Sequence, residues 1–215
     1  YLLILSEIKT KDSMTLTAIN KEILDASYNY EEYKALIAEL LEQGRTTNEE
    51  NSESMLNYTK MNTQRTSRWD KRAKINDELE RLINGISTEQ IWMVITEGWC
   101  GDAAQILPFV NKMVKLNDKI ELKLILRDQF PEVMDEFLTE GSRSIPKVVI
   151  LDKESLEVLG SWGPRPKVAH VDYMQKRADV NYENSKAAED LHLWYARDKG
   201  KTTQDEFKQL LESLD

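Results

Sequence analysis

The stretch Glu97-Gly98-Trp99-Cys100-Gly101-Asp102-Ala103 (EGWCGDA) separates two segments with different hydrophobic patterns. Residues 91–96 (IWMVIT) before it form a short continuous apolar run, which is typical of a strand buried on both faces. The residues after it repeat apolar side chains at helical spacing, namely Ile106, Leu107, Val110, Met113, Val114 and Leu116. The sequence therefore predicts that Cys100, its one cysteine, lies where a buried strand passes into a helix.

A cysteine at the start of a helix can be chemically activated. Free backbone N–H groups and the helix dipole favour the thiolate, and can lower a thiol pKa from about 8.5 to roughly 3.5–7.5. The thiolate is the nucleophile in disulfide exchange. We expect Trp99 and Gly101 to leave the sulfur accessible beside a flat apolar wall. Asp102 would oppose activation, because a nearby carboxylate raises a thiol pKa, unless its side chain caps the helix instead.

The segments beyond this helix extend the same fold. We expect strands at 120–127, 147–151 and 156–162, with the last two joined as a hairpin by residues 152–155. A short helix over 131–139 begins with a proline in its first turn. A β-α-β unit followed by a ββα unit predicts an α/β fold, a mixed sheet with helices on both faces.

Helical patterns flank this region on both sides. Before it we expect helices over 29–43, 52–72 and 76–84, and after it helices over 168–182 and 185–198 and a last one opening at Thr202. The predicted organisation is a helical N-terminal extension (1–86), a core (87–182) and a helical C-terminal extension packed on the core (183–215).

Composition excludes several classes of function. The 215 residues include 29 Lys and Arg against 38 Asp and Glu, a net charge of −9, which disfavours nucleic acid and anionic membranes as partners. No apolar run reaches the roughly 18 residues of a membrane span, and residues 2–8 are given no functional weight, so the cytoplasm is the expected location. One cysteine excludes a disulfide framework and a cysteine-rich zinc site. The two histidines, His170 and His192, are expected on the surface, and no metal site is expected.

Two motifs together carry a family resemblance. Trp99-Cys100-Gly101-Asp102-Ala103, with Ser144-Ile145-Pro146 about 45 residues later, resembles the thioredoxin superfamily, which has W-C-G-P-C after its first core strand and a cis-proline before the next antiparallel strand. The wider pattern resembles a bacterial branch known as thioredoxin family proteins, and includes Leu126-Arg127-Asp128, Arg143 and Trp162-Gly163-Pro164-Arg165-Pro166.

The departures from that pattern shape the expected function. Ala103 replaces the second cysteine and Asp102 replaces the proline, so no disulfide can form within the motif and the dithiol mechanism does not carry over. One hypothesis is a monothiol thiol–disulfide oxidoreductase of redox homeostasis, in which Cys100 forms mixed disulfides with protein thiols or with a small thiol such as glutathione. The alternative is a redox-inactive thioredoxin-like module that binds a partner protein through the groove at Ile145-Pro146 and through its helical extensions. A third option is a thiol that peroxide oxidises to a sulfenic acid.

The resemblance also implies which residues form the site. Cys100 and Pro146 are the expected catalytic residues, and Ile145 would offer backbone hydrogen bonds to an extended substrate strand. The guanidinium of Arg143 would hold the Cys100 thiolate or bind a carboxylate of a small thiol, unless it forms an ordinary ion pair. The substrate-binding set is Trp99, Gly101, Asp102, Arg143 and Ile145. No cofactor is expected, and the protein is expected to be a monomer or a homodimer.

Overall fold

The computed structural model describes residues 18–49 and 51–214 and contains a mixed four-stranded sheet. The strands are β1 (Gln90–Thr96), β2 (Ile120–Leu126), β3 (Lys147–Asp152) and β4 (Val158–Trp162), in the order β2-β1-β3-β4. β1 is parallel to β2 and antiparallel to β3, and β4 is antiparallel to β3. This is the thioredoxin-like α/β fold that the sequence predicts.

Burial follows the sequence pattern closely in the centre of the sheet. All seven residues of β1 are buried, as are the first five of β3, whereas β4 at the edge alternates. The helix α5 (Gly101–Val114) follows β1 and is buried along almost its whole length. A buried strand leading into a buried helix fixes the backbone on either side of Cys100.

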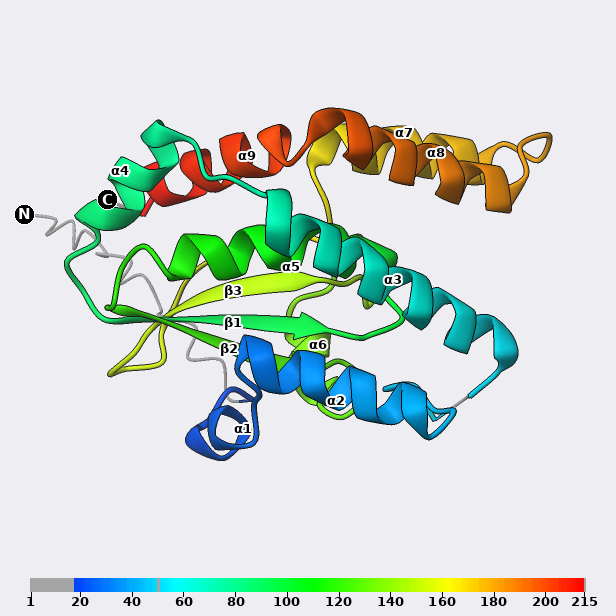
Figure 1. Cartoon of the computed structure of the whole chain (residues 1–215). Helices are drawn as coiled ribbons and strands as arrows, with labels where there is room; N and C mark the ends of the chain where they lie inside the picture. Colours follow the sequence, from blue (N-terminus) through cyan, green and yellow to red (C-terminus); the bar gives the residue numbers. More distant parts are fainter. Residues whose placement is uncertain (1–17, 50, 215) are drawn as a thin grey trace, which may run out of the picture.

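Helices cover both faces of the sheet (Figure 1). With α5, the helices α4 (Asp77–Gly85) and α9 (Lys201–Glu212) lie on one face, and α1 (Lys21–Asp25) and α6 (Pro131–Glu136) lie on the other. Phe207 of α9 is fully buried and stacks on Trp92 of β1. The C-terminal helix therefore belongs to the hydrophobic core that contains the sheet.

Two long N-terminal helices lie beside the sheet and α5. α2 (Tyr30–Glu42) begins with a capping box formed by Asn29 and Glu32, and α3 (Glu53–Arg72) packs along α5. Trp69 of α3 contacts the ring of Phe109 and donates a 2.6 Å hydrogen bond to Gln105. The N-terminal extension therefore packs directly on the helix that begins at Cys100.

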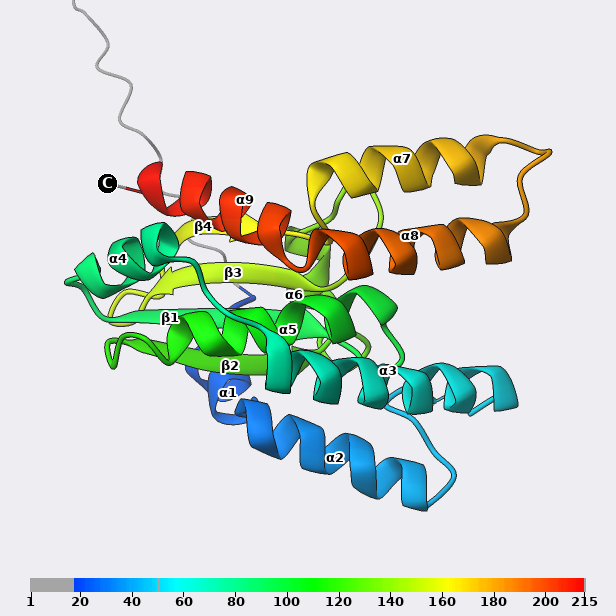
Figure 2. The same ribbon diagram turned by 45° about the horizontal axis from the view of Figure 1, so that its top comes forward.

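The helices α7 (Lys167–Ala178) and α8 (Asn184–Asp198) form a pair that projects past the end of the sheet (Figure 2). The sequence pattern did not predict the short α1, and it extended α6 and α7 too far. Residues 2–8 lie outside the described residues. Within the described part of the chain, no helix is long and apolar enough to span a membrane.

Candidate functional site around Cys100

Cys100 lies between the first turn of α5 and the loop before β3. It is the N-cap residue of α5, and its sulfur accepts a 3.5 Å hydrogen bond from the backbone N–H of Ala103. The Sγ–H donates to the carbonyl oxygen of Ile145 at 3.3 Å. The next peptide bond, Ile145–Pro146, is cis. The two motifs therefore meet at the sulfur.

Cys100 is buried, which differs from the accessible sulfur that the sequence predicts. Cys100 is only 7% exposed, and burial raises the pKa of its thiol to about 12, with the charge of Asp102 as the next cause. The N–H groups of Ala103 and Asp102 and the charge of Arg165 lower the pKa, but by less. The free-energy cost of burying a thiolate here is therefore larger than the stabilisation that the helix N-terminus and the nearby cation give it.

Asp102 does not cap the helix but forms a buried ion pair. Its Oδ2 accepts hydrogen bonds from Nη2 of Arg165 at 2.6 Å and from Nε at 3.1 Å, and its Oδ1 accepts one from the Tyr195 hydroxyl at 2.6 Å. Arg165 also contacts Nδ1 of His170 at 3.1 Å and lies over the ring of Tyr173. The segment Trp162–Pro166 thus supplies the arginine that faces Asp102.

Arg143 does not face the thiol. Its guanidinium makes two 2.7 Å hydrogen bonds to the carboxylate of Asp135, and both side chains are half exposed. The arginine that acts electrostatically on Cys100 is Arg165, from the β4–α7 connection. The sequence pattern indicated the wrong arginine because Arg143 is closer to Pro146 along the chain, whereas Arg165 is brought in by the fold.

Gly101 allows α8 to pack closely on the start of α5, and does not expose the Cys100 sulfur to solvent. A Cβ on Gly101 would lie 2.7 Å from Cε1 of His192, so a side chain there would collide with the imidazole. His192 also contacts Gln105 through Nδ1 at 3.3 Å, and burial lowers the pKa of its imidazole to about 4. His192 is therefore a neutral, half-buried residue at the helix start, and the expectation of a surface histidine was wrong.

The other predicted substrate residues are also covered. Ile145 is 5% exposed and Pro146 is buried. A Cβ on Gly163 would lie 2.2 Å from the Pro146 carbonyl oxygen, so the β4–α7 connection packs directly on the proline. The ring of Trp99 is covered by the guanidinium of Arg127, 4.7 Å from its centre. Since these groups are in contact with the protein itself, no open groove for a substrate strand runs along Ile145-Pro146.

Glu97 is a buried carboxylic acid that the sequence analysis did not single out. It accepts a 3.0 Å hydrogen bond from the backbone N–H of Asp128 and a short one from the hydroxyl of Thr47. Burial raises the pKa of its carboxyl to about 7. The Thr47 hydroxyl also accepts a hydrogen bond from the N–H of Gly98 at 3.1 Å. The α2–α3 connection is therefore fixed to the loop that carries Cys100.

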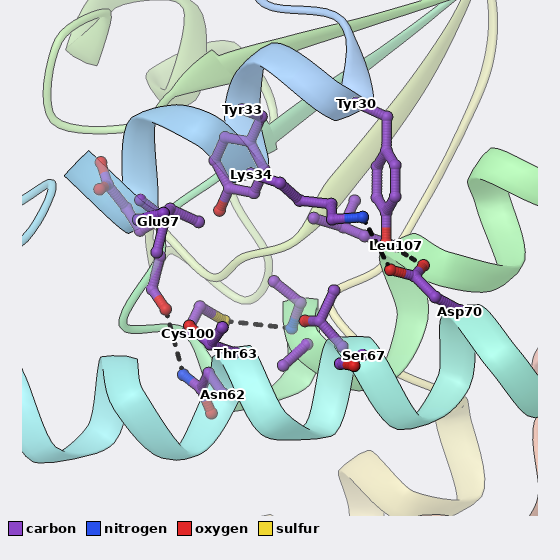
Figure 3. Close-up of a pocket in the computed structure, with 16 residues that line it drawn as sticks. Tyr30, Tyr33, Lys34, Asn62, Thr63, Ser67, Asp70, Glu97, Cys100 and Leu107 are labelled. Atoms are coloured by element: carbon purple, nitrogen blue, oxygen red, sulfur yellow. Dashed lines mark hydrogen bonds and ion pairs between the residues drawn. The ribbon is translucent and has the colours of Figure 1, made fainter. Parts of the chain in front are cut away.

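A cavity of about 260 Å³ lies between α2, α3 and α5, with Cys100 in its wall (Figure 3). Tyr30, Tyr33 and Lys34 of α2 face Thr63, Ser67 and Asp70 of α3 across it. The complete lining is Tyr30, Tyr33, Lys34, Ile37, Ala38, Asn62, Thr63, Thr66, Ser67, Asp70, Glu97, Gly98, Cys100, Ala103, Ala104 and Leu107. Ten of these sixteen residues belong to the N-terminal extension and six to the core, so the cavity exists only where that extension meets the core.

The structure brings some of the predicted site residues together around Cys100, and places further residues beside them. The Cys100 sulfur meets the carbonyl of Ile145 beside the cis bond to Pro146, and the charge of Asp102 acts on the same thiol, whereas Arg143 points to Asp135. The residues that sequence reasoning missed in this role are Glu97, Arg165, His192 and Tyr195. Of these, Arg165 lay inside a motif that the sequence analysis quoted. In the described part of the chain, no three His, Cys, Asp or Glu side chains are grouped so as to hold a metal ion.

Fold and site together define a thioredoxin-fold protein with one cysteine at the start of its first core helix. A family model described as Thioredoxin matches residues 48–191, more than half of the chain, and the protein therefore belongs to the thioredoxin family. No curated protein matches the chain.

Two solved structures resemble this one. An HIV epitope scaffold of the 4E10 series has a TM-score of 0.53 at 18% identity, covering 89% of this chain and 96% of its own. A protein of unknown function from Pseudomonas aeruginosa has a TM-score of 0.45 at 17% identity, covering 87% and 95%. At such identities the first likeness concerns the fold alone.

Proposed function

We propose that this protein is a thioredoxin-like binding module in which Cys100 stays a protonated thiol. The proposal rests on the 3.3 Å contact between Cys100 Sγ and the carbonyl of Ile145. A carbonyl oxygen can only accept a hydrogen bond, so this contact favours the S–H form, which can donate to it, over a thiolate, which cannot. The burial that raises the pKa of this thiol favours the same form.

The proposed binding site is the cavity between α2, α3 and α5, not the Ile145-Pro146 groove. Ile145 and Pro146 are buried, and the Ile145 carbonyl already has a donor. The cavity, in contrast, has room for a ligand and joins the N-terminal extension to the core. A single cysteine kept as a thiol fits a reducing compartment, and we propose the cytoplasm as its location.

A monothiol oxidoreductase is the second candidate, favoured by the position of the sulfur. Cys100 lines the cavity and receives the N–H of Ala103. In this reaction the Cys100 sulfur would attack a disulfide RSSR, the S–S bond would break, and a mixed disulfide would form as RSH leaves with the thiol proton. A second thiol, from a small molecule such as glutathione, would then release Cys100 for redox homeostasis.

Iodoacetamide alkylation at pH 7 separates the two candidates, because it reports the thiolate fraction and its exposure. We expect the folded protein to react at least about tenfold more slowly than the same protein in urea. Mass spectrometry of the Cys100→Ser variant controls for reaction elsewhere. A folded protein that reacts faster than free cysteine would contradict the binding module and support the monothiol enzyme.

A further inference from the structure

We propose that the cavity between α2, α3 and α5 binds a small uncharged molecule with an apolar, ring-sized body and a hydroxyl or amide at one end. This rests on the proposed function and specifies its ligand. The volume of about 260 Å³ sets the size. An apolar cavity of about 150 Å³ accommodates benzene, so this one accommodates a ring with a short substituent.

The two ends of the cavity have different chemistry. Ile37, Ala103, Ala104 and Leu107 provide apolar surface from α2 and α5. Thr63, Ser67 and Asp70 of α3 point into it from the opposite side (Figure 3), and Thr66 of the same helix also belongs to the lining. A ligand in this space would direct its apolar body towards α5 and its polar end towards α3.

Neither an anionic nor a cationic ligand would find a free counter-ion in the cavity. Lys34 is the sole cation among the described residues that line the cavity, and its Nζ lies 3.0 Å from Asp70 and 3.3 Å from Glu31. Asp70 also accepts a 2.7 Å hydrogen bond from the Tyr30 hydroxyl.

The other acid in the lining is also engaged. The carboxyl of Glu97 is held by the Asp128 N–H and the Thr47 hydroxyl. A charged ligand would have to enter without a partner, which is costly in a largely apolar site. The ligand is therefore uncharged, and a small acidic thiol such as glutathione does not fit this chemistry.

Three probes of one shape and different charge test this inference. NMR titration of the intact protein with 4-methylphenol, 4-methylbenzoate and 4-methylbenzylammonium follows the amide signals of Ala103 and Ala104. We expect 4-methylphenol to shift these signals and to bind about tenfold more tightly than either ion. Signal shifts for residues outside the cavity would overturn the proposal. So would equal affinities of 4-methylphenol and the two ions, or no binding of 4-methylphenol at millimolar concentration.

A pair of variants on one helix locates the bound probe. Ala38 lines the cavity, whereas Ala35 is exposed on the same helix and does not. Ala38→Trp should weaken binding of 4-methylphenol about tenfold, and Ala35→Trp should leave it within about twofold. Because both positions are on the exposed surface, both variants should fold. Equal effects of the two variants would overturn the assignment of the cavity.

The outcomes for the site and for the proposed function can be told apart. Rapid alkylation of Cys100 together with selective binding of 4-methylphenol would overturn the inert thiol but leave the ligand class intact. A protected thiol with no binding of 4-methylphenol would overturn the ligand class alone.

Discussion

The hydroxyl of Tyr195 donates a 2.6 Å hydrogen bond to Oδ1 of Asp102, and so joins α8 to the first turn of α5. Arg165 holds Oδ2 of the same carboxylate at 2.6 Å, and the side chains of Arg165 and Asp102 are only 12% and 9% exposed. The residue that follows Gly101 in the motif therefore connects three separate parts of the chain.

Asp102→Asn should destabilise the protein strongly, because it leaves the guanidinium of Arg165 buried without its counter-ion. Breaking a buried pair in this way typically costs about 3–5 kcal/mol. Asp135→Asn is the matched control, since Asp135 also holds an arginine through two hydrogen bonds but in an exposed pair that should contribute little. Urea unfolding of both variants gives the comparison, and similar losses would contradict a special role for Asp102.

The same Asp102→Asn change should lower the pKa of the Cys100 thiol. The Asp102 charge is the second cause of the raised pKa, and Arg165 would then act on the thiol without a carboxylate beside it. The midpoint of the pH profile of iodoacetamide alkylation should move down from that of the wild type, which burial places at about 12. An unchanged midpoint would mean that desolvation alone determines the thiol pKa.

Gly101→Ala should separate α8 from the start of α5. Its Cβ would lie 2.7 Å from His192 Cε1, so the imidazole or the whole helix must move. We expect lower stability and faster alkylation of Cys100. Gly85→Ala is the control, because a Cβ there meets nothing within 4 Å and alanine favours a helix. If the two variants melt at the same temperature, the close packing of His192 is not important for stability.

Glu97 should make the protein less stable as the pH rises from about 4.5 to 7. Burial raises the pKa of its carboxyl from 4.5 to about 7, so the folded state binds a proton that the unfolded state has released in this range. At about 1.4 kcal/mol for each pKa unit, the full effect is roughly 3.5 kcal/mol. It is present below pH 4.5 and lost above pH 7.

The test compares the pH dependence of the free energy of unfolding in the wild type and in Glu97→Gln. The glutamine variant retains a carbonyl that can accept from Asp128 and Thr47 but has no proton to lose. His192, whose pKa burial lowers to about 4, acts in the opposite direction between pH 4 and 6.5, and it does so in both proteins. If the two proteins have the same pH profile, Glu97 does not titrate in this range.

The central fold was predictable because its signals are local. The apolar run at 91–96, the helical spacing after Cys100 and the hairpin at 152–155 each determine an element by their own residues. Helix starts such as the capping box at Asn29 are local as well. The short α1 was missed because its five residues are too few to show a helical period.

The site was predictable only in part. Cys100, Asp102, Ile145 and Pro146 could be found from motifs, but the state of the thiol could not. Arg165 lies 63 positions from Asp102, and Tyr195 lies 93 positions from it. Helical periodicity shows that α8 has a buried face, but does not say which surface covers that face.

The sequence by itself determined an α/β fold and placed the single cysteine at the start of a helix, since both depend on short-range patterns of apolar residues, and its motifs carried the resemblance to the thioredoxin superfamily. Tertiary structure alone decided that this cysteine is a buried thiol. α3 packs along α5, and His192 of α8 lies against Gly101, so that Cys100 is buried at the start of α5. Burial and the charge of Asp102 both raise the pKa of its thiol. The cost of desolvating a thiolate then exceeds the stabilisation that a helix N-terminus can offer.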